Sequence, residues 1–188
     1  IAGNCIPLGD IAQSYNGIAT KRDKNKYITA EKKNSLYKPL LEGKDIGQYS
    51  INFNNKYILY DKKKLHRPRN EKIFLSPEKI VTQRIGGGTR VITAALDDKQ
   101  FYTFNSVNNI IVQNKSFSAN YILAVLNSRL LNWYYVTKFT NKSLLTVNIS
   151  KTNLEQLPIK NTTSKEKKKI TDSVVELQNT GEKMRKIG

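Results

Sequence analysis

The apolar residues of this chain change their spacing once, near Ser118. Before that point they form short runs rich in β-branched and aromatic residues, separated by turn residues. From residue 118 to residue 139 they recur at three- and four-residue intervals, as on one face of a helix. This change predicts an α+β fold: a twisted, mainly antiparallel β region with a supporting amphipathic helix and a C-terminal helix.

The β-type runs define the expected strands. We expect a first strand within residues 6–15 and a turn at Asn16-Gly17, because both residue types tolerate positive φ. Further strands are predicted at residues 57–60, 79–85, 90–96, 101–104, 109–113 and 144–149. The glycines between two of these runs predict a hairpin with its tip at residues 86–89.

Helix signals dominate the last third of the chain. Ser118 is placed to cap a single helix over residues 118–139, and a short helix over 152–157 is expected to stop at Pro158. Thr163 and Glu166 have capping-box spacing, and an apolar stripe follows them at Ile170, Val174, Leu177 and Met184. We therefore expect one domain over residues 1–160 and a helical segment, 161–188, that packs on it or extends from it.

Positive charge is spread over the whole chain. The 188 residues include 32 Lys and Arg against 15 Asp and Glu, a net charge of +17. Residues 1–159 hold 24 basic and 11 acidic side chains, so the predicted body alone carries +13. Such an excess favours a polyanionic partner, above all nucleic acid. The alternative explanations of the charge are an anionic membrane surface, a ribosome, and simple bias from an AT-rich coding sequence.

Few residue types suited to catalysis are present. A single cysteine, Cys5, and a single histidine, His66, argue against a disulfide framework, a multi-cysteine metal site and a Ser-His-Asp system. Glu-x-Lys pairs, as in metal-dependent nucleases, occur at Glu31/Lys33, Glu42/Lys44 and Glu166/Lys168, but none follows a convincing acidic strand. Asp97-Asp98 fits a turn. We predict no catalytic residue and no metal site.

Methyl transfer to a flipped base is also excluded for these residues. It would need a glycine-rich cofactor loop and an Asn/Asp-Pro-Pro-aromatic motif, and none of the five prolines are adjacent. Gly86-Gly87-Gly88 fits a mobile hairpin tip, or a backbone that approaches a ligand closely.

Three basic loops, at residues 20–26, 62–69 and 83–90, remain as a binding surface. Arg can read guanine and Asn or Gln can read adenine, whereas lysines mainly hold phosphates. The base-reading candidates are Thr20, Lys21, Arg22, Asp23, Gln83, Arg84 and Arg90. The phosphate-binding candidates are Lys24, Lys26, Lys62, Lys63, Lys64, Arg67, Arg69, Lys142 and Ser143.

The chain begins Ile-Ala-Gly-Asn, with neither Met nor a signal peptide. We expect a fragment of a longer polypeptide that resides in the cytoplasm.

Several strings occur in the order of one known family. Leu8-Gly9-Asp10-Ile11 and Gly17-Ile18-Ala19-Thr20 resemble the opening of DNA target-recognition domains. Residues 40–49, LLEGKDIGQY, resemble the L-x-x-G-x-D-I-x-x-Y string of the TaqI-like C-terminal specificity domain. Residues 79–84, 121–128 and 154–159 continue the resemblance, which covers residues 6–159. The strings themselves are expected to be scaffold, with Gly43 and Asp45 in a turn and residues 154–158 in packing.

The resemblance implies sequence-specific recognition of double-stranded DNA within a type IIG restriction–modification enzyme or adenine-specific methyltransferase. A catalytic domain elsewhere on the same polypeptide would bind S-adenosylmethionine; no cofactor is expected here. Half of a type I specificity subunit is the nearest alternative. A self-contained metal-dependent nuclease and a basic ribosome- or membrane-surface protein are alternatives of other classes.

Overall fold

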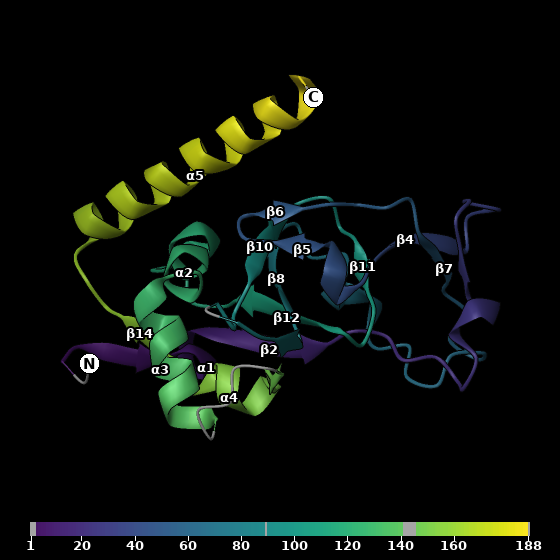
Figure 1. Ribbon diagram of the computed structural model, residues 1–188, viewed down its shortest axis with the longest axis horizontal. Helices are drawn as coiled ribbons and strands as arrows, with labels where there is room; N and C mark the ends of the chain where they lie inside the picture. Colours follow the sequence, from purple (N-terminus) through teal and green to yellow (C-terminus); the bar gives the residue numbers. More distant parts are fainter. Residues whose placement is uncertain (1–2, 89, 141–145, 188) are drawn as a thin grey trace.

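Two small sheets and a group of helices follow one another along the molecule (Figure 1). The computed structural model describes residues 3–88, 90–140 and 146–187, with side chains up to residue 180. A central sheet lies between a helical end and a second sheet at the opposite end, and the longest helix, α5 (Ser164–Ile187), lies across the helical end. The predicted α+β class is confirmed.

The central sheet has the order β10-β8-β12-β2, and all its neighbours are antiparallel. Its strands are β2 (Ala12–Asn16), β8 (Lys79–Gln83), β10 (Ala94–Asp97) and β12 (Val107–Val112). The predicted strand over residues 6–15 is wrong in part, because it divides into β1 (Cys5–Pro7), one helical turn α1 (Leu8–Ile11) and β2. β1 pairs with β14 (Pro158–Lys160), and the turn buries Leu8 and Ile11 in the main core.

The second sheet has the order β11-β4-β7-β3, and only β11 and β4 run parallel. Its strands are β3 (Ile28–Thr29), β4 (Tyr37–Leu41), β7 (Tyr57–Leu59) and β11 (Tyr102–Thr103). The strands predicted around residues 57–60 and 101–104 are thus confirmed. Phe74 stacks on Tyr102, with ring centroids 4.8 Å apart, and Tyr60 lies 5.0 Å from Tyr102. These rings give the second sheet a core of its own.

Two strand pairs and three short 3₁₀ turns complete the β region. The pairs are β9 (Ile85–Gly86) with β13 (Val147–Asn148), and β5 (Ile46–Gly47) with β6 (Ser50–Ile51). The turns are η1 (Lys24–Lys26), η2 (Gly43–Asp45) and η3 (Glu71–Ile73). The turn predicted at Gly43 and Asp45 is confirmed, since Asp45 Oδ2 accepts from the backbone N of Glu42 at 2.7 Å.

The predicted hairpin is confirmed, because β8 pairs with β10 and Gly87 bridges to Arg90. Thr89 at its tip lies outside the described residues. The predicted turn at Asn16-Gly17 is wrong: Gly17 is buried, and its N donates to Val107 O. A Cβ on Gly17 would lie 2.1 Å from Phe104 O, so this glycine permits a close approach of two backbones.

The helix predicted over residues 118–139 is two helices, α2 (Ala119–Leu126) and α3 (Arg129–Phe139). Ser118 caps the first as expected, with its Oγ accepting from Tyr121 N. The break follows from Asn127, whose amide donates to Ala94 O and accepts from Ala94 N at 2.9 and 3.0 Å. Ser128 then caps the second helix. The short helix before Pro158 is confirmed as α4 (Lys151–Glu155), and Leu154 and Leu157 are buried as expected.

α5 begins as predicted, since Thr163 Oγ1 accepts from Glu166 N and Glu166 Oε2 accepts from Thr163 N. Its apolar stripe is buried only at Val174, whereas Ile170 and Leu177 are exposed. Met184 lies outside the described side chains. Lys167 Nζ lies 3.7 Å from the ring centroid of Phe117, and Thr171 hydrogen-bonds Ser118, which holds α5 against α2. No helix in the described ranges is both long and apolar enough to span a membrane.

Candidate nucleic-acid interface

Two of the three basic loops predicted from the sequence are joined. Ala19 and Arg67 form an antiparallel bridge, with N to O distances of 3.1 Å and 2.9 Å. Tyr27 donates from its hydroxyl to Lys64 O at 3.2 Å, which adds a second link. Asp23 accepts from Asn25 N and caps η1, so Asp23 shapes its own loop. The loops around residues 20–26 and 62–69 therefore form one surface.

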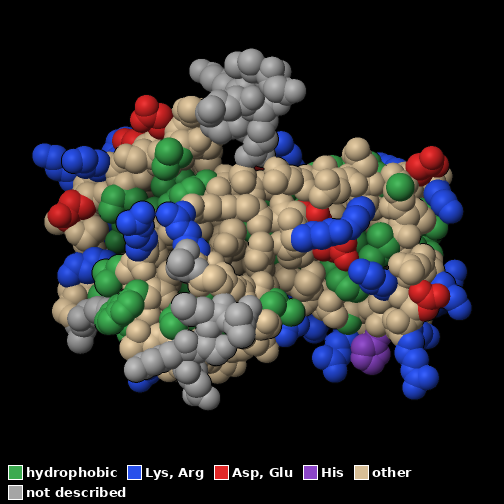
Figure 2. All heavy atoms as spheres, in the orientation of Figure 1, with side chains coloured by type: hydrophobic (Ala, Val, Ile, Leu, Met, Phe, Trp, Pro, Cys, Tyr) green, Lys and Arg blue, Asp and Glu red, His purple; other side chains and the backbone are tan. Residues whose placement is uncertain are grey.

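A hollow of about 620 Å³ opens between these loops and the turn after β11. Its lining consists of Thr20, Lys21, Arg22, Lys24, His66, Phe104 and Asn105. In Figure 2 several Lys and Arg side chains stand around the one histidine, at the lower right of the view. The hollow therefore combines the positive charges of Lys21, Arg22 and Lys24 with the neutral hydrogen-bonding groups of Thr20 and Asn105.

A second hollow, of about 530 Å³, shares Lys24 with the first. It is lined by Lys24, Glu42, Gly43, Lys44, Gln83, Ile85 and Ser106. We call the two hollows together the basic trough. The trough brings the base-reading candidates Thr20, Lys21, Arg22 and Gln83 onto one face, and Lys24 stands where the hollows meet.

Glu42 is the one acidic side chain in the lining of the trough. It pairs with Lys24 at 3.2 Å and forms a closer pair with Lys56. Burial raises the pKa of Glu42, but the two ammonium groups outweigh burial and hold the pKa below its ordinary value. Glu42 therefore stays ionised at neutral pH and fixes the position of Lys24.

Arg67, Arg69 and Arg84 lie close enough to interact electrostatically. Burial lowers the pKa of Arg69, and the positive charges of Arg67 and Arg84 lower it further. Arg69 Nε donates to Gly17 O at 3.0 Å. The backbone of Arg69 is in the left-handed region, with a φ of 66°. Within the described part of the chain, all seven ion pairs use lysine, so these arginines have no carboxylate within 4.0 Å. Arg69 and Arg84 donate to backbone carbonyls and not to carboxylates, so a bound anion would lower the repulsion among the three arginines.

Arg84 and Gln83 are positioned by backbone carbonyls. Arg84 Nη1 donates to Asn105 O at 2.9 Å, and its buried Nε has no partner among the described atoms. Gln83 Nε2 donates to Ile46 O at 2.8 Å. Successive strand residues point to opposite sides, which explains why Gln83 and Ile85 line the trough and Arg84 does not.

The remaining candidates lie elsewhere or at the margin. Arg90 hydrogen-bonds Gln48 and lines neither hollow. Lys26 is exposed on η1, and Lys62, Lys63 and Lys64 are exposed on the neighbouring loop. Lys62 and Lys64 form long ion pairs with Glu71 and Asp61, at 4.0 and 3.7 Å. Lys142 and Ser143 lie outside the described residues.

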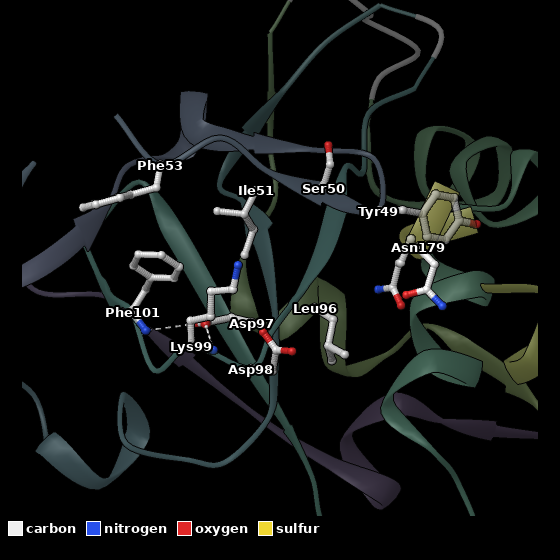
Figure 3. Close-up of a pocket in the computed structure, with 11 residues that line it drawn as sticks. Tyr49, Ser50, Ile51, Phe53, Leu96, Asp97, Asp98, Lys99, Phe101 and Asn179 are labelled. Carbon is white, nitrogen blue, oxygen red and sulfur yellow. Dashed lines mark hydrogen bonds between the residues drawn. The ribbon is translucent and has the colours of Figure 1, made fainter. Parts of the chain in front are cut away.

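A hollow on another side of the molecule contains the predicted Asp97-Asp98 turn (Figure 3). It has a volume of about 250 Å³ and lies between β6, β10 and α5. Asp97 accepts from Lys99 N at 2.9 Å and Phe101 N at 3.0 Å, and its buried carboxylate lies 2.6 Å from Lys79 Nζ. The turn is confirmed. Protein donors therefore occupy the carboxylate of Asp97, which holds the turn in place.

The described residues contain no group of three or more His, Cys, Asp or Glu side chains that could hold a metal ion. Of the Glu-x-Lys pairs, Glu42 is bound by two lysines and Glu166 caps α5. The trough also contains residues that were not predicted to bind DNA, among them Lys44, Ile85, Asn105 and Ser106. Only the alternation that places Ile85 beside Gln83 could have pointed to one of them.

Known proteins resemble this chain in sequence. The family model of the TaqI-like C-terminal specificity domain matches residues 38–159. A curated relative is the "Putative type II restriction enzyme and methyltransferase RM.MjaORFECS2P" of Methanocaldococcus jannaschii, 29% identical over 160 residues. The match covers 80% of this chain but only 12% of that protein.

Two solved structures share the fold. The HsdS subunit from Thermoanaerobacter tengcongensis matches with a TM-score of 0.58 and 12% identity, over 100% of this chain and 40% of that one. The type IIL restriction–modification enzyme MmeI in complex with DNA matches with a TM-score of 0.61 and 10% identity, over 93% of this chain and 29% of that one.

Proposed function

This chain belongs to the family of TaqI-like C-terminal specificity domains, and from that membership we propose that it recognises a sequence in double-stranded DNA through the basic trough. The observation that supports this most is the trough itself, in which Lys21, Arg22, Lys24 and Lys44 stand among neutral hydrogen-bonding side chains. Arg67, Arg69 and Arg84 add further positive charge, with no carboxylate within 4.0 Å among the described residues. Phosphates would neutralise the cations, and the neutral donors and acceptors would contact base edges.

In this proposal the candidates have separate roles. Phosphates are bound by Lys24, Lys26, Lys62, Lys63, Lys64, Arg67 and Arg69, with Lys142 and Ser143 as further candidates. Bases are contacted by Thr20, Lys21, Arg22, Asp23, Gln83 and Arg84. Arg90 contacts a more distant base. Residues 1–160 form the recognition domain, and residues 161–188 form a helical segment that packs on it.

Catalysis is assigned to a partner. We propose that the partner is an adenine-specific methyltransferase domain of the same polypeptide, in a cytoplasmic type IIG enzyme. The relative from Methanocaldococcus jannaschii, named as a putative type II restriction enzyme and methyltransferase, supports this. S-adenosylmethionine would bind to that domain. Gly86, in the one run of glycines, does not cradle a cofactor, because it packs against Val91 O, where a Cβ would lie at 2.0 Å. No step of methyl transfer is therefore assigned here.

A second candidate function is half of a type I specificity subunit. The fold likeness that supports it spans the whole chain and 40% of an HsdS subunit. Sequencing the coding region on both sides of this chain separates the two proposals. An Asn-Pro-Pro-Tyr-type motif upstream would support the type IIG proposal, and a second recognition domain would support type I.

The proposed function is tested by binding. Fluorescence anisotropy would compare the affinity of the 188-residue chain for a duplex selected from a random pool, a scrambled duplex and anionic lipid vesicles. We expect tighter binding to the selected duplex, weakening about 10³-fold or more between 50 and 200 mM salt. Equal binding to both duplexes would contradict the proposal, and preference for vesicles would support a membrane-surface protein. Cleavage of DNA by the chain with Mg²⁺ would support a nuclease.

A further inference from the structure

Ile85 is an exposed apolar residue within the basic trough. Its side chain is 62% exposed and lines the basic trough between Lys24, Lys44 and Gln83. The other exposed large apolar side chains of the described region lie off the trough: Leu130 and Trp133 on α3, Ile170, Val175 and Leu177 on α5, and Leu36 and Leu75 in loops. Ile85 is thus an apolar group surrounded by cations on the proposed DNA face.

The backbone under Ile85 is held on both sides. Arg84 N donates to Ser106 O at 2.9 Å, and Ile149 N donates to Arg84 O at 2.8 Å. Ile85 itself pairs with Asn148 in the β9–β13 ladder. A side chain on such a fixed backbone keeps its position when a ligand binds, as a specificity-determining residue must.

Gln83 presents a polar group on the same side. Its Nε2 donates one hydrogen to Ile46 O, which sets the plane of the amide. An amide has two N–H donors and an accepting oxygen, so one N–H and Oε1 remain available beside Ile85. This donor–acceptor pair matches N7 and the N6 amine of adenine in the major groove, and an apolar group matches the 5-methyl of thymine.

We propose that Gln83 and Ile85 together read an A·T base pair from the major groove. Gln83 donates from Nε2 to adenine N7 and accepts from N6, while Ile85 contacts a thymine methyl of the same or an adjacent pair. This inference rests on the proposed function, because it identifies the base pair that the trough selects.

The test removes single atoms from the DNA. After the preferred duplex is found by selection, each thymine is replaced in turn by uracil, which lacks the methyl, and each adenine by 7-deazaadenine, which lacks N7. At one A·T pair, or at two adjacent pairs, we expect each replacement to weaken binding of the wild-type chain about three- to fivefold. The uracil effect should disappear in Ile85→Ala, and the deaza effect should disappear in Gln83→Ala.

Leu75→Ala is the matched control, because it also shortens an exposed apolar side chain, 47% exposed, off the trough. It should keep both effects. If the preferred duplex is bound but Ile85→Ala and Gln83→Ala retain the wild-type losses, the A·T inference is overturned while the proposed function stands. If no sequence is preferred by the wild-type chain, the proposed function itself fails. Circular dichroism checks the fold of each variant, and Ile85→Ala alone decides the methyl contact if Gln83→Ala unfolds.

Discussion

Ala19 and Arg67 exchange two backbone hydrogen bonds, with Ala19 N 3.1 Å from Arg67 O and Arg67 N 2.9 Å from Ala19 O. The bridge joins two loops that are far apart in the sequence, and both line one hollow, with Lys21, Arg22 and Lys24 from the first loop and His66 from the second. Because both partners are backbone groups, the side chain of Arg67 is left to meet a ligand. The candidate interface therefore depends on backbone pairing, and its charge can be changed without removing the bridge.

Arg84→Ala should weaken binding to the preferred duplex by about 1–3 kcal/mol and relax selectivity at one base position. The reason is that the bond from Arg84 Nη1 to Asn105 O orients the guanidinium group, and an oriented guanidinium can donate to a base without first being ordered. Affinities for the preferred duplex and its single-base variants, measured for wild type and Arg84→Ala, give the result. Arg129→Ala, an exposed arginine on α3, is the control. Equal losses on preferred and random duplexes would remove the base-reading role.

Lys63→Ala should weaken binding to every duplex by the same factor. Lys63 is exposed, and a lysine that neutralises one phosphate contributes about 0.9 to the slope of log affinity against log salt. Titrations at several salt concentrations measure that slope. Lys168→Ala removes an equally exposed lysine from α5 and should leave the slope unchanged. A selective loss on one sequence would argue that Lys63 contacts a base.

Lys79→Met should destabilise the fold by about 3–5 kcal/mol, because it leaves the Asp97 carboxylate buried without its cation. Urea unfolding measures the loss. Lys79→Met combined with Asp97→Asn removes both charges and keeps an acceptor for the backbone amides of the turn, so it should recover part of the stability. A double variant less stable than Lys79→Met would contradict this account of the ion pair.

Gly17→Ala should cost about 3 kcal/mol or more, since the added Cβ would lie 2.1 Å from Phe104 O. Gly3→Ala is the control, because no atom lies within 4 Å of its added Cβ. Thermal and urea unfolding compare the two. Equal stability of both variants would show that the close approach at Gly17 is not required.

The stability of the fold should depend on pH through Glu42. Its pKa is lowered in the folded state, so its contribution is complete above the unfolded pKa of about 4.3 and disappears as the pH falls through the lower folded value. Urea midpoints between pH 3 and pH 7 should therefore fall less steeply with acid in Glu42→Gln than in wild type. Glu31→Gln, at an exposed glutamate, should follow wild type. An unchanged acid dependence in Glu42→Gln would contradict the assignment.

The class of the fold and most strands could be predicted from local patterns, because alternation, turn residues and caps act within a few residues. The break between α2 and α3 could not, because it depends on the hydrogen bonds of Asn127 to Ala94 in the central sheet. The burial of Lys79 could not be predicted either, since its partner Asp97 lies on a neighbouring strand.

The candidate site was predictable at the level of loops but not of side chains. Charge and loop composition indicated the segments that carry Lys24, Arg67 and Gln83. Which side chains meet in the trough depends on the Ala19–Arg67 bridge and on the pairing of β9 with β13, which are long-range contacts. Ile85 was missed because an isoleucine in a β-type run is more often buried.

The central claim is that the basic trough selects a DNA sequence, and one selection experiment tests it most directly. Three proteins would each select from a random duplex pool, followed by sequencing. They are the 188-residue chain, a trough variant with Lys21, Arg22 and Lys24 changed to Ala, and a charge-matched variant with Lys165, Lys168 and Lys169 changed to Ala. We predict that the wild type and the α5 variant enrich the same motif and that the trough variant enriches none. No motif from the wild type, or the same motif from the trough variant, would contradict the account.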